Sequence, residues 1–539
     1  MKFKRCLAVL AAVTMTVSCT GCSLGDSIMK KLLGIEDYQL TAEQQAQRFD
    51  VEGMRRKAEE MSDTWTRLDK DAQLREDIEW MIAQADAAAE VYFTNELAYY
   101  ADWKNPAVEA MYNQTYEDYY VAFEILYWTL MNGYHNSTYD EIFGEYLGDV
   151  AEDQSYKDYY TAISLEKTIH NGQSDSAYYN GALNDYYDVS GDTSMDADDA
   201  DLECAKMYLE NLKTYDCSAY LYDMYARDYQ AEDTSALYAQ MLTELQPLYD
   251  TLYEMVVEHP KYDELYTDAL GVDDLFGTVR NYAARISPEL ETSAQKLIDE
   301  QWYTIGTGDA CYTGSYCISI PGKEKALLYI YQNHEFYDFS TAVHEFGHFH
   351  AEWRNDISLF YQVNCVDIAE VQSQGLSMLY TEFYDGIFGE NAEYLEMVAL
   401  YDIVDSIVCG LAVGEFEYRV MEQLDDITAE EVVELFYEIN DAANTGYILK
   451  DISHLYEQPG YYVSYAISAI SAMQIYITMQ DDFDEAVKMY EAVAKISSND
   501  GKYEIGGAME VCGFDDIFAP ETMTAIADEV RGFIAECQS

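Results

Sequence analysis

The scarcity of proline constrains the fold of this chain more than any other feature. Only 7 of the 539 residues are proline, so little in the sequence interrupts a long helix. In residues 41–169 and 202–257, apolar residues recur at helical spacing between acidic ones. A polar, acidic segment at 188–201 separates these stretches. We therefore expect a mostly α protein with an N-terminal helical region, residues 41–200, and a second helical region, residues 201–539.

The charge of the chain is strongly negative. It contains 100 Asp and Glu against 31 Lys and Arg, a net charge of −69 at pH 7. Such a protein is repelled by nucleic-acid phosphates, which excludes general nucleic-acid binding. An anionic membrane surface also repels it, so membrane attachment needs an anchor other than charge. The acidity would attract cationic peptides, although solubility in an extracellular setting is the plainer explanation.

The N-terminus has the pattern of an export signal. Basic residues precede a short uncharged, apolar run that ends near Cys19, too short for a comfortable membrane span. Residues 21–23, Gly-Cys-Ser, resemble a bacterial lipoprotein cleavage site, which implies removal of residues 1–21 and lipid on the Cys22 thiol. An ordinary cleaved signal peptide is the alternative. We expect an exported protein, anchored to the cell membrane by this lipid and facing outside the cytoplasm, with residues 22–40 as a tether.

Two segments differ from the amphipathic helical pattern. Residues 317–333 contain short β-rich runs on either side of Pro321 and Gly322, which predicts a hairpin-like pair of strands. Residues 461–479 carry no formal charge and are nearly long enough to span a membrane. Their serines and tyrosines favour a buried core helix instead.

Eight cysteines remain beyond Cys22, and export permits disulfides. Cys311 and Cys317 bracket a turn-like segment and are the best local pair, while free, buried cysteines are the alternative. No CxxC pair occurs, so a thiolate zinc site is not expected.

The most informative motif is HEFGH at residues 344–348. On a helix, His344 and His348 lie on one face, so both imidazoles can bind a single Zn²⁺. Glu345 lies about 100° around the helix from His344, where it can reach a water activated by the metal without itself being a ligand. Two histidines on a solvated helix face are the alternative. The motif predicts one catalytic zinc per chain.

A catalytic zinc needs a third protein ligand. Glu352 lies on the same helix as His348 and cannot readily fold back around the metal. Asp356 is a further candidate, while Asp367 and Glu370 follow a turn and lie on what reads as a second helix. A carboxylate presented by a neighbouring helix would complete a His₂Glu site, and we choose Glu370.

These residues resemble the thimet oligopeptidase and oligoendopeptidase F family of zinc peptidases. HEFGH followed by AEVQSQ, which contains Glu370, resembles the family's zinc helix and the helix that carries its ligand glutamate. The run TGDACYTGSYCISI resembles the segment before HExxH in oligoendopeptidase F. The stretch SHLYEQPGYYVSYAISAISAMQIY resembles the family's downstream catalytic stretch. The resemblance covers about residues 300–520.

The resemblance implies a large, helical, two-lobed peptidase with a deep central channel that admits short peptides. It also implies that Tyr462, Tyr465 or both donate to the oxyanion and that His454 helps to position the substrate. On a helix, Tyr462 and Tyr465 are three residues apart, so both can face the cleft. From the β-rich sequence we expect residues 325–333 to offer a strand edge that pairs with the peptide backbone.

The sequence departs from the family at two positions. Ala351 stands where the family usually has another histidine, with His350 one place early, and Ser377 stands where the family tends to have glutamate. We expect a zinc metalloendopeptidase of the gluzincin type that cleaves short peptides. A lipid-anchored peptide-binding protein or inactive peptidase, and a related zinc carboxypeptidase or dipeptidase, are the alternatives.

Overall fold

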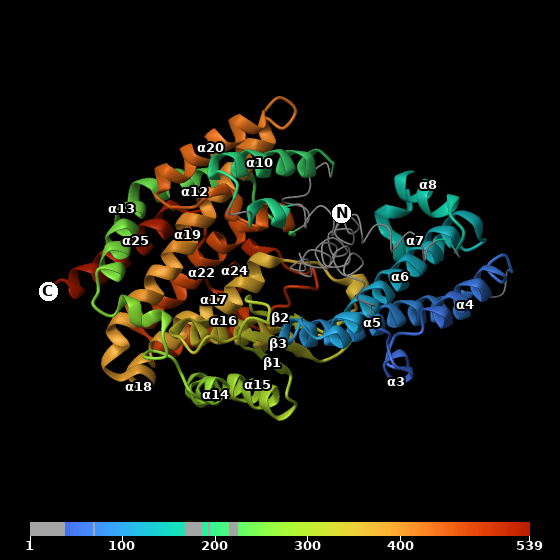
Figure 1. Cartoon of the computed structure of the whole chain (residues 1–539), viewed down its shortest axis with the longest axis horizontal. Helices are drawn as coiled ribbons and strands as arrows, with labels where there is room; N and C mark the ends of the chain where they lie inside the picture. Colours follow the sequence, from blue (N-terminus) through green and yellow to red (C-terminus); the bar gives the residue numbers. More distant parts are fainter. Residues whose placement is uncertain are drawn as a thin grey trace.

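The chain folds into a mostly helical molecule with one small sheet. A computed structural model describes residues 38–67, 71–152, 154–165, 167, 186–191, 194–214 and 225–539. The predicted signal peptide, Cys22 and the tether up to residue 37 lie outside these ranges. In Figure 1 the N-terminal helices extend to one side of a larger helical body, and the sheet lies near the junction. The mostly α class is confirmed, while the boundary at residue 200 stays a prediction.

The N-terminal part is built on a pair of long helices, α5 and α6, which pack against each other (Figure 1). Its helices are α3 (Ala42–Gln45), α4 (Val51–Ser62), α5 (Asp71–Ala101), α6 (Pro106–Asn136), α7 (Asp140–Leu147) and α8 (Gln154–Ala162). Thr41 caps α3 in a capping box with Gln44, as its sequence pattern indicates. An apolar core rich in tyrosine fills the space between these helices.

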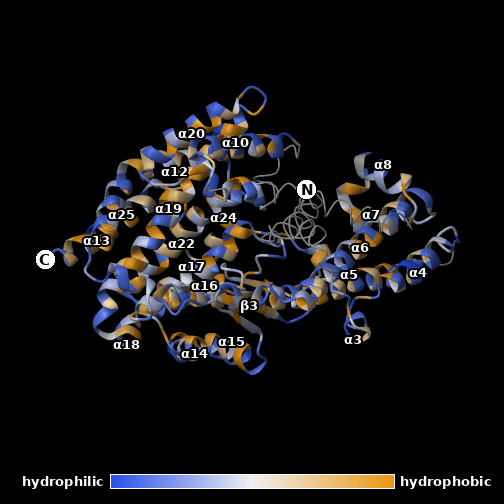
Figure 2. Ribbon diagram, in the orientation of Figure 1, coloured by the Kyte–Doolittle hydropathy of each residue, from blue (hydrophilic) through white to orange (hydrophobic). Residues whose placement is uncertain are grey.

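The larger body has its own apolar core, at the centre of which α17, α19 and α22 pack together (Figures 1 and 2). Its helices are α10 (Ala197–Thr214), α12 (Ala231–Glu244), α13 (Gln246–Val257), α14 (Leu275–Ile286), α15 (Pro288–Asp299), α16 (Phe336–Glu352), α17 (Val366–Thr381), α18 (Tyr384–Phe388), α19 (Ala392–Glu422), α20 (Ala429–Ala443), α21 (His454–Glu457), α22 (Tyr462–Asp481), α23 (Phe483–Val493), α24 (Ile505–Cys512) and α25 (Pro520–Cys537). Short 3₁₀ helices are η1 (Gly148–Glu152), η2 (Tyr262–Tyr266), η3 (Leu359–Tyr361), η4 (Gly389–Asn391) and η5 (Leu449–Asp451).

Helix α10 begins at Ala197, within the acidic segment expected to be a break. Asp198 and Asp199 lie in its first turn, where negative charge favours the helix dipole. The uncharged segment 461–479 forms most of the largely buried α22, as expected of a core helix. In the described part of the chain, one stretch, Tyr384–Glu422, is apolar and long enough to cross a membrane. About 72% of its most apolar window is buried inside the protein.

The sheet has three strands in the order β1–β3–β2, and β3 connects the two cores. β2 (Tyr316–Ser319) pairs antiparallel with β3 (Ala326–Tyr331), which confirms the expected strand pair. β1 (Tyr303–Gly306), which the sequence did not indicate, pairs parallel on the other side of β3. The expectation that residues 325–333 offer a free strand edge is therefore wrong, because both edges of β3 are occupied. The open edge, on the strand that packs against α16, belongs to β2.

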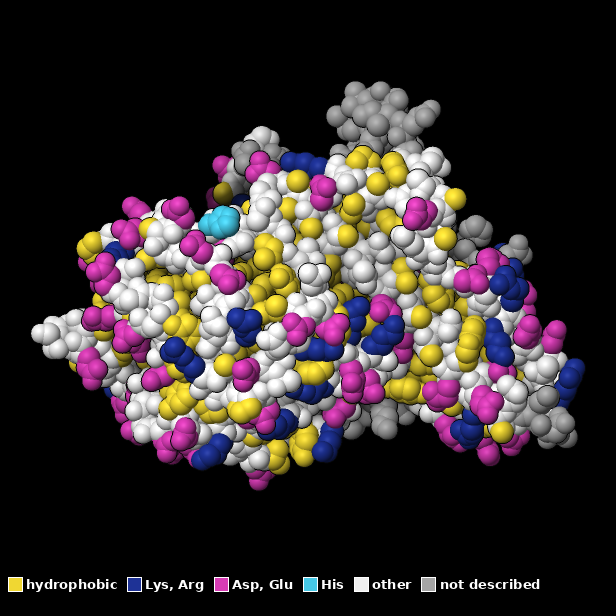
Figure 3. All heavy atoms as spheres, turned by 90° about the horizontal axis from the view of Figure 1, so that it is seen from below, with side chains coloured by type: hydrophobic (Ala, Val, Ile, Leu, Met, Phe, Trp, Pro, Cys, Tyr) yellow, Lys and Arg dark blue, Asp and Glu magenta, His cyan; other side chains and the backbone are white. Residues whose placement is uncertain are grey.

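All seven cysteines that the structure describes are free, including Cys311 and Cys317, so the local disulfide considered from the sequence does not form. The Cys311 thiol instead donates to the backbone oxygens of Ala101 and Thr307. On the face in Figure 3, acidic and basic side chains are interspersed, so the excess of negative charge is not gathered into one patch there.

Candidate active site

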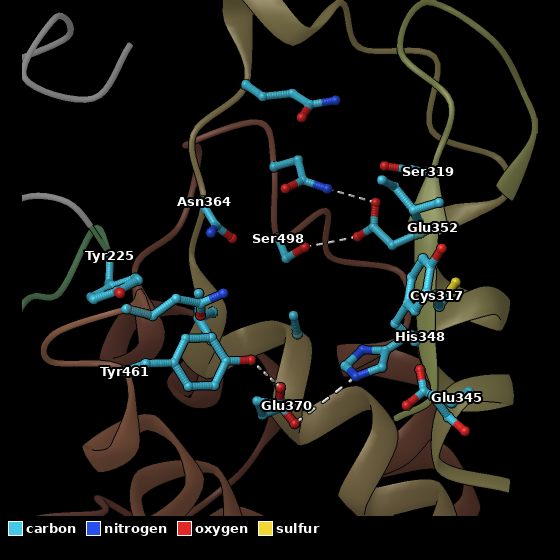
Figure 4. Close-up of a pocket in the computed structure, with 18 of the residues that line it drawn as sticks. Tyr225, Cys317, Ser319, Glu345, His348, Glu352, Asn364, Glu370, Tyr461 and Ser498 are labelled. Atoms are coloured by element: carbon cyan, nitrogen blue, oxygen red, sulfur yellow. Dashed lines mark hydrogen bonds and ion pairs between the residues drawn. The ribbon is translucent and has the colours of Figure 1, made fainter. Parts of the chain in front are cut away.

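Helices α16 and α17 bring the three predicted metal ligands together. His344 and His348 lie one turn apart on α16, and Glu370 faces them from α17. Oε2 of Glu370 is 3.5 Å from Nε2 of His344 and 3.9 Å from Nε2 of His348. One ligand atom from each of the three residues lies within 4.8 Å of the others. Figure 4 shows His348 and Glu370 facing each other.

A glycine allows these two helices to approach closely. A Cβ placed on Gly347 would lie 2.6 Å from Cα of Ser373 and 2.7 Å from the backbone oxygen of Gln372, both on α17. Side-chain atoms are not found this close to another backbone, so any larger residue would push α16 away from α17. Gly347 therefore sets the separation between the histidines and Glu370.

The three donors fit a tetrahedral zinc ion. Ligands bound at the usual zinc distances in a tetrahedron are about 3.4 Å apart, close to the separations found here. Metal-binding imidazoles must be neutral. Burial lowers the pKa of His344 to about 4, although the Glu370 carboxylate opposes this, so its ring is neutral at pH 7. About 28% of the His344 side chain remains accessible from the cavity.

Glu345 lies beside this group and is enclosed by the protein. Its exposed fraction is 7%, and it lines the cavity together with Cys317 of β2. Burial raises the pKa of Glu345 to about 8, and the charge of Glu370 adds to the effect. A divalent cation beside it would favour the ionised form, which can accept a proton.

The other carboxylates considered as third ligand have different partners. Asp367 is buried and paired with Arg227, while Asp356 is exposed. Glu352 accepts hydrogen bonds from Ser498 and Asn499, away from the histidines (Figure 4). Among these four candidates, only Glu370 lies beside both histidines.

The structure brings Tyr461, rather than Tyr462, to the cluster formed by His344, His348 and Glu370. The Tyr461 hydroxyl donates to Oε1 of Glu370 at 2.6 Å, which leaves Oε2 directed at the histidines (Figure 4). Tyr461, Tyr465 and His454 line the same cavity, with the Tyr461 and Tyr465 rings 5.2 Å apart. Burial lowers the pKa of His454 to about 4. Tyr461 therefore orients Glu370 as a hydrogen-bond donor.

The sequence allowed both Tyr465 and Tyr462 to face the cleft, but Tyr462 is not part of the cavity lining. Its ring packs against Tyr447 and the edge of His454, outside the cavity lining. Tyr461 and Tyr465 are four residues apart and share a helix face, whereas Tyr462 is rotated by about 100° from Tyr461. The four-residue spacing was present in the sequence and could have indicated Tyr461.

We expect Tyr461→Phe to fold normally but to bind zinc about 10- to 100-fold more weakly, because it removes the hydrogen bond that orients a ligand carboxylate. Zinc affinity measured by competition with a chelating dye tests this. Tyr462→Phe is the matched control on the adjacent residue and should bind zinc like the wild type. Equal zinc affinity in both variants would contradict the orienting role of Tyr461.

The side chains surround a cavity of about 420 Å³ (Figure 4). β2 forms one wall, and Phe93 and Glu96 of α5 contribute from the N-terminal part. Metal-binding donors, a buried carboxylate and tyrosine hydroxyls thus converge on one space large enough for a segment of peptide.

No protein-family model and no curated protein matches this sequence. Solved structures do match, over nearly the whole chain. A crystal structure assigned as oligoendopeptidase F aligns with a TM-score of 0.67 at 16% identity, covering 90% of this chain and 97% of its own. The chain has the oligoendopeptidase F fold.

Two further structures support this assignment of the fold. PZ peptidase A with an inhibitor aligns with a TM-score of 0.66 at 15% identity, over 91% of this chain and 98% of its own. A protein from Bacillus anthracis, also assigned as oligoendopeptidase F, aligns with a TM-score of 0.66 at 15% identity, over 93% of this chain and 98% of its own. The large helical architecture expected from the resemblance is therefore confirmed.

The structure shows what His350 and Ser377 contact at the two places where the sequence departs from the family pattern. His350 is buried away from the cavity, with Nδ1 2.9 Å from Oγ of Ser293 and Nε2 3.8 Å from Oε2 of Glu491. His350 thereby connects α16 to α15 and α23. Ser377 donates to the backbone oxygen of Ser373 within α17. Neither side chain is part of the cavity lining.

Proposed function

We propose that this protein is a zinc-dependent peptidase that hydrolyses peptide bonds in short peptides, an oligoendopeptidase of the gluzincin type. The observation that carries the proposal is the convergence of His344, His348 and Glu370 beside Glu345 in one cavity. The oligoendopeptidase F fold supports it.

His344, His348 and Glu370 would hold one zinc ion, which would supply a Lewis acid that activates water and polarises the scissile carbonyl. Glu345 is placed to accept the proton from the attacking water and to deliver it to the leaving amine. The Tyr465 hydroxyl would donate to the oxygen that becomes negative in the transition state. His454, neutral at pH 7, would contact the substrate beside it.

The exposed edge of β2 would bind the peptide backbone. Tyr316, Cys317 and Ser319 line the cavity, and the neighbour of β2 on its other side is β3. An extended peptide can pair with this free edge through main-chain hydrogen bonds. This would position the peptide beside Glu345, which lines the same cavity as β2, with little dependence on the side chains of the peptide.

The direct test is to measure metal content and to incubate the purified protein with a mixed pool of short peptides. We expect one zinc per chain and internal cleavage of peptides blocked at both ends. Loss of single residues or dipeptides from free ends would instead support an exopeptidase. Binding without cleavage would favour an inactive peptidase, and absence of zinc after reconstitution would refute the metal assignment.

We propose further that the mature protein begins at Cys22 and is held at the outer side of the cell membrane by lipid on that residue. The basic, apolar and Gly-Cys-Ser pattern of the N-terminus supports this. Cys22→Ser should convert a membrane-bound protein into one released by washing, because the charge of the body repels an anionic membrane. Mass spectrometry of an unmodified mature N-terminus beginning elsewhere would refute the anchor.

A further inference from the structure

The cavity is lined by several carboxylates and, among the described residues, by no lysine or arginine. Apart from Glu345 and Glu370, three more glutamates line it, from three different helices: Glu96 of α5, Glu352 of α16 and Glu457 of α21. No lysine or arginine is part of that lining. A peptide entering this space therefore meets three carboxyl groups in addition to those of the proposed metal ligand Glu370 and the proposed base Glu345.

Glu352 is the best placed of the three to act on a substrate. It lies four residues after His348, so its Cα is about 6 Å further along the same side of the helix. The Glu352 side chain points into the cavity in Figure 4, and the exposed fraction of the residue is 7%. Helix α16, which carries Glu352, packs against β2, and Glu352 and Cys317 line the same cavity.

Neutral groups hold the Glu352 carboxylate in place. Oε1 accepts a hydrogen bond from the Ser498 hydroxyl at 2.8 Å, and Oε2 accepts from the Asn499 and Asn355 amides at 2.8 and 3.1 Å. No Lys, Arg or His in the described ranges forms an ion pair with Glu352. Each carboxylate oxygen can accept more than one hydrogen bond, so a cationic group entering the cavity can still bind there.

The two other glutamates are bonded to tyrosines. Glu96 accepts from Tyr92 and Tyr316, and Glu457 accepts from Tyr187. Burial raises the pKa of Glu96 to about 8 and that of Glu457 to about 7, so both are partly protonated near neutral pH. They add to the negative potential of the cavity mainly when a cation is near them.

We propose that Glu352 selects cationic peptides by binding an ammonium or guanidinium group of the substrate close to the scissile bond, an inference that rests on the proposed peptidase function. The group is either a Lys or Arg side chain or the free N-terminus, because both offer the same charged donors. A charge-assisted hydrogen bond inside a cavity discriminates against an uncharged isostere more strongly than an exposed ion pair does.

Three peptides that differ only at one position or at the N-terminus distinguish a side-chain cation from a free N-terminus. The first is blocked at both ends and carries lysine near the cleavage site, the second carries norleucine in its place, and the third is the norleucine peptide with a free N-terminus. We compare kcat/KM of the wild type, Glu352→Gln and Glu434→Gln. Glu434 is exposed on α20, outside the cavity lining, so its variant removes one negative charge without touching the site.

In the wild type, we expect at least one of the two cationic peptides to be cleaved about 10- to 100-fold more efficiently than the blocked norleucine peptide. Glu352→Gln should abolish this preference, measured within the variant as the ratio of kcat/KM for the cationic and the blocked norleucine peptides. Glu352→Asp, which restores the charge, should recover part of the preference. Glu434→Gln should behave like the wild type, which separates a local contact from the field of the whole protein.

Binding provides a readout independent of turnover. Fluorescence anisotropy with the labelled lysine and norleucine peptides, in a Glu345→Gln background, measures the same difference as a ratio of Kd values. If the wild type cleaves all peptides but prefers neither cation, or if Glu352→Gln keeps the preference, the assignment to Glu352 is overturned while the peptidase remains. If no peptide is cleaved, the proposed function fails, and the Kd ratio still decides whether Glu352 selects cations.

Discussion

The Glu345→Gln variant should retain zinc and bind peptides like the wild type, while turnover falls by about 10²–10⁴-fold. The amide keeps the size of the side chain but cannot accept a proton at neutral pH. Glu345 is not one of the three clustered donors, so the metal should remain bound. Metal analysis, Kd for a labelled peptide and single-turnover cleavage together separate this loss of chemistry from a loss of structure.

His344→Ala is the informative comparison for that experiment. It removes one of the three clustered donors, and two remaining protein ligands rarely hold a catalytic zinc, so both metal and activity should be lost. If both variants are inactive but only Glu345→Gln retains zinc, Glu345 acts as the base and His344 as a metal ligand. Peptide cleavage by Glu345→Gln at the wild-type rate would show that another group takes the proton.

The sequence predicted those features of the site that depend on spacing within one helix. His344 and His348 lie together because four residues make about one helical turn, whatever the rest of the chain does. Glu345 follows from the same geometry. Spacing alone could not identify Glu370, because its distance from the two histidines depends on how α17 packs on α16. The close approach of these helices at Gly347 is a tertiary contact that spacing does not predict. The resemblance to a known family reinforced the choice of Glu370.

The errors arose where the answer depended on helix boundaries or on tertiary pairing. Whether Tyr461 or Tyr462 faces the cavity depends on a rotation of about 100°, fixed by how α22 packs and not by composition. Strand order is likewise invisible in a single sequence. β3 reads as a strand, but its central position comes from β1, a four-residue strand too short to give a clear alternating pattern.

No local sequence pattern predicts the buried ion pair between Arg227 and Asp367. Arg227 and Asp367 are 140 residues apart in the chain, yet their side chains are 1% and 0% exposed, and Nε of Arg227 lies 3.6 Å from Oδ2 of Asp367. Arg227 also donates to the Gly460 backbone oxygen at 2.8 Å and to the Ser464 hydroxyl at 2.6 Å. This network connects α17 to the start of α22, next to Glu370 and Tyr461.

Arg227→Ala should therefore lower the free energy of unfolding by about 3–5 kcal/mol, the cost of leaving one member of a buried pair uncompensated. Burial raises the pKa of Asp367, and Arg227 opposes that effect. Without the guanidinium, the carboxylate must either take up a proton or draw water into the core. Urea denaturation of the metal-free protein measures the loss.

Two controls identify its cause. Arg75→Ala breaks an exposed pair with Glu145 and should change stability little, because solvent screens it. The double variant Arg227→Leu, Asp367→Leu removes both buried charges and should recover most of the loss. Asp367 is three residues before Glu370 on α17, so Arg227→Ala should also weaken zinc binding. Equal stability of Arg227→Ala and Arg75→Ala would show that the buried pair does not hold α17 in place.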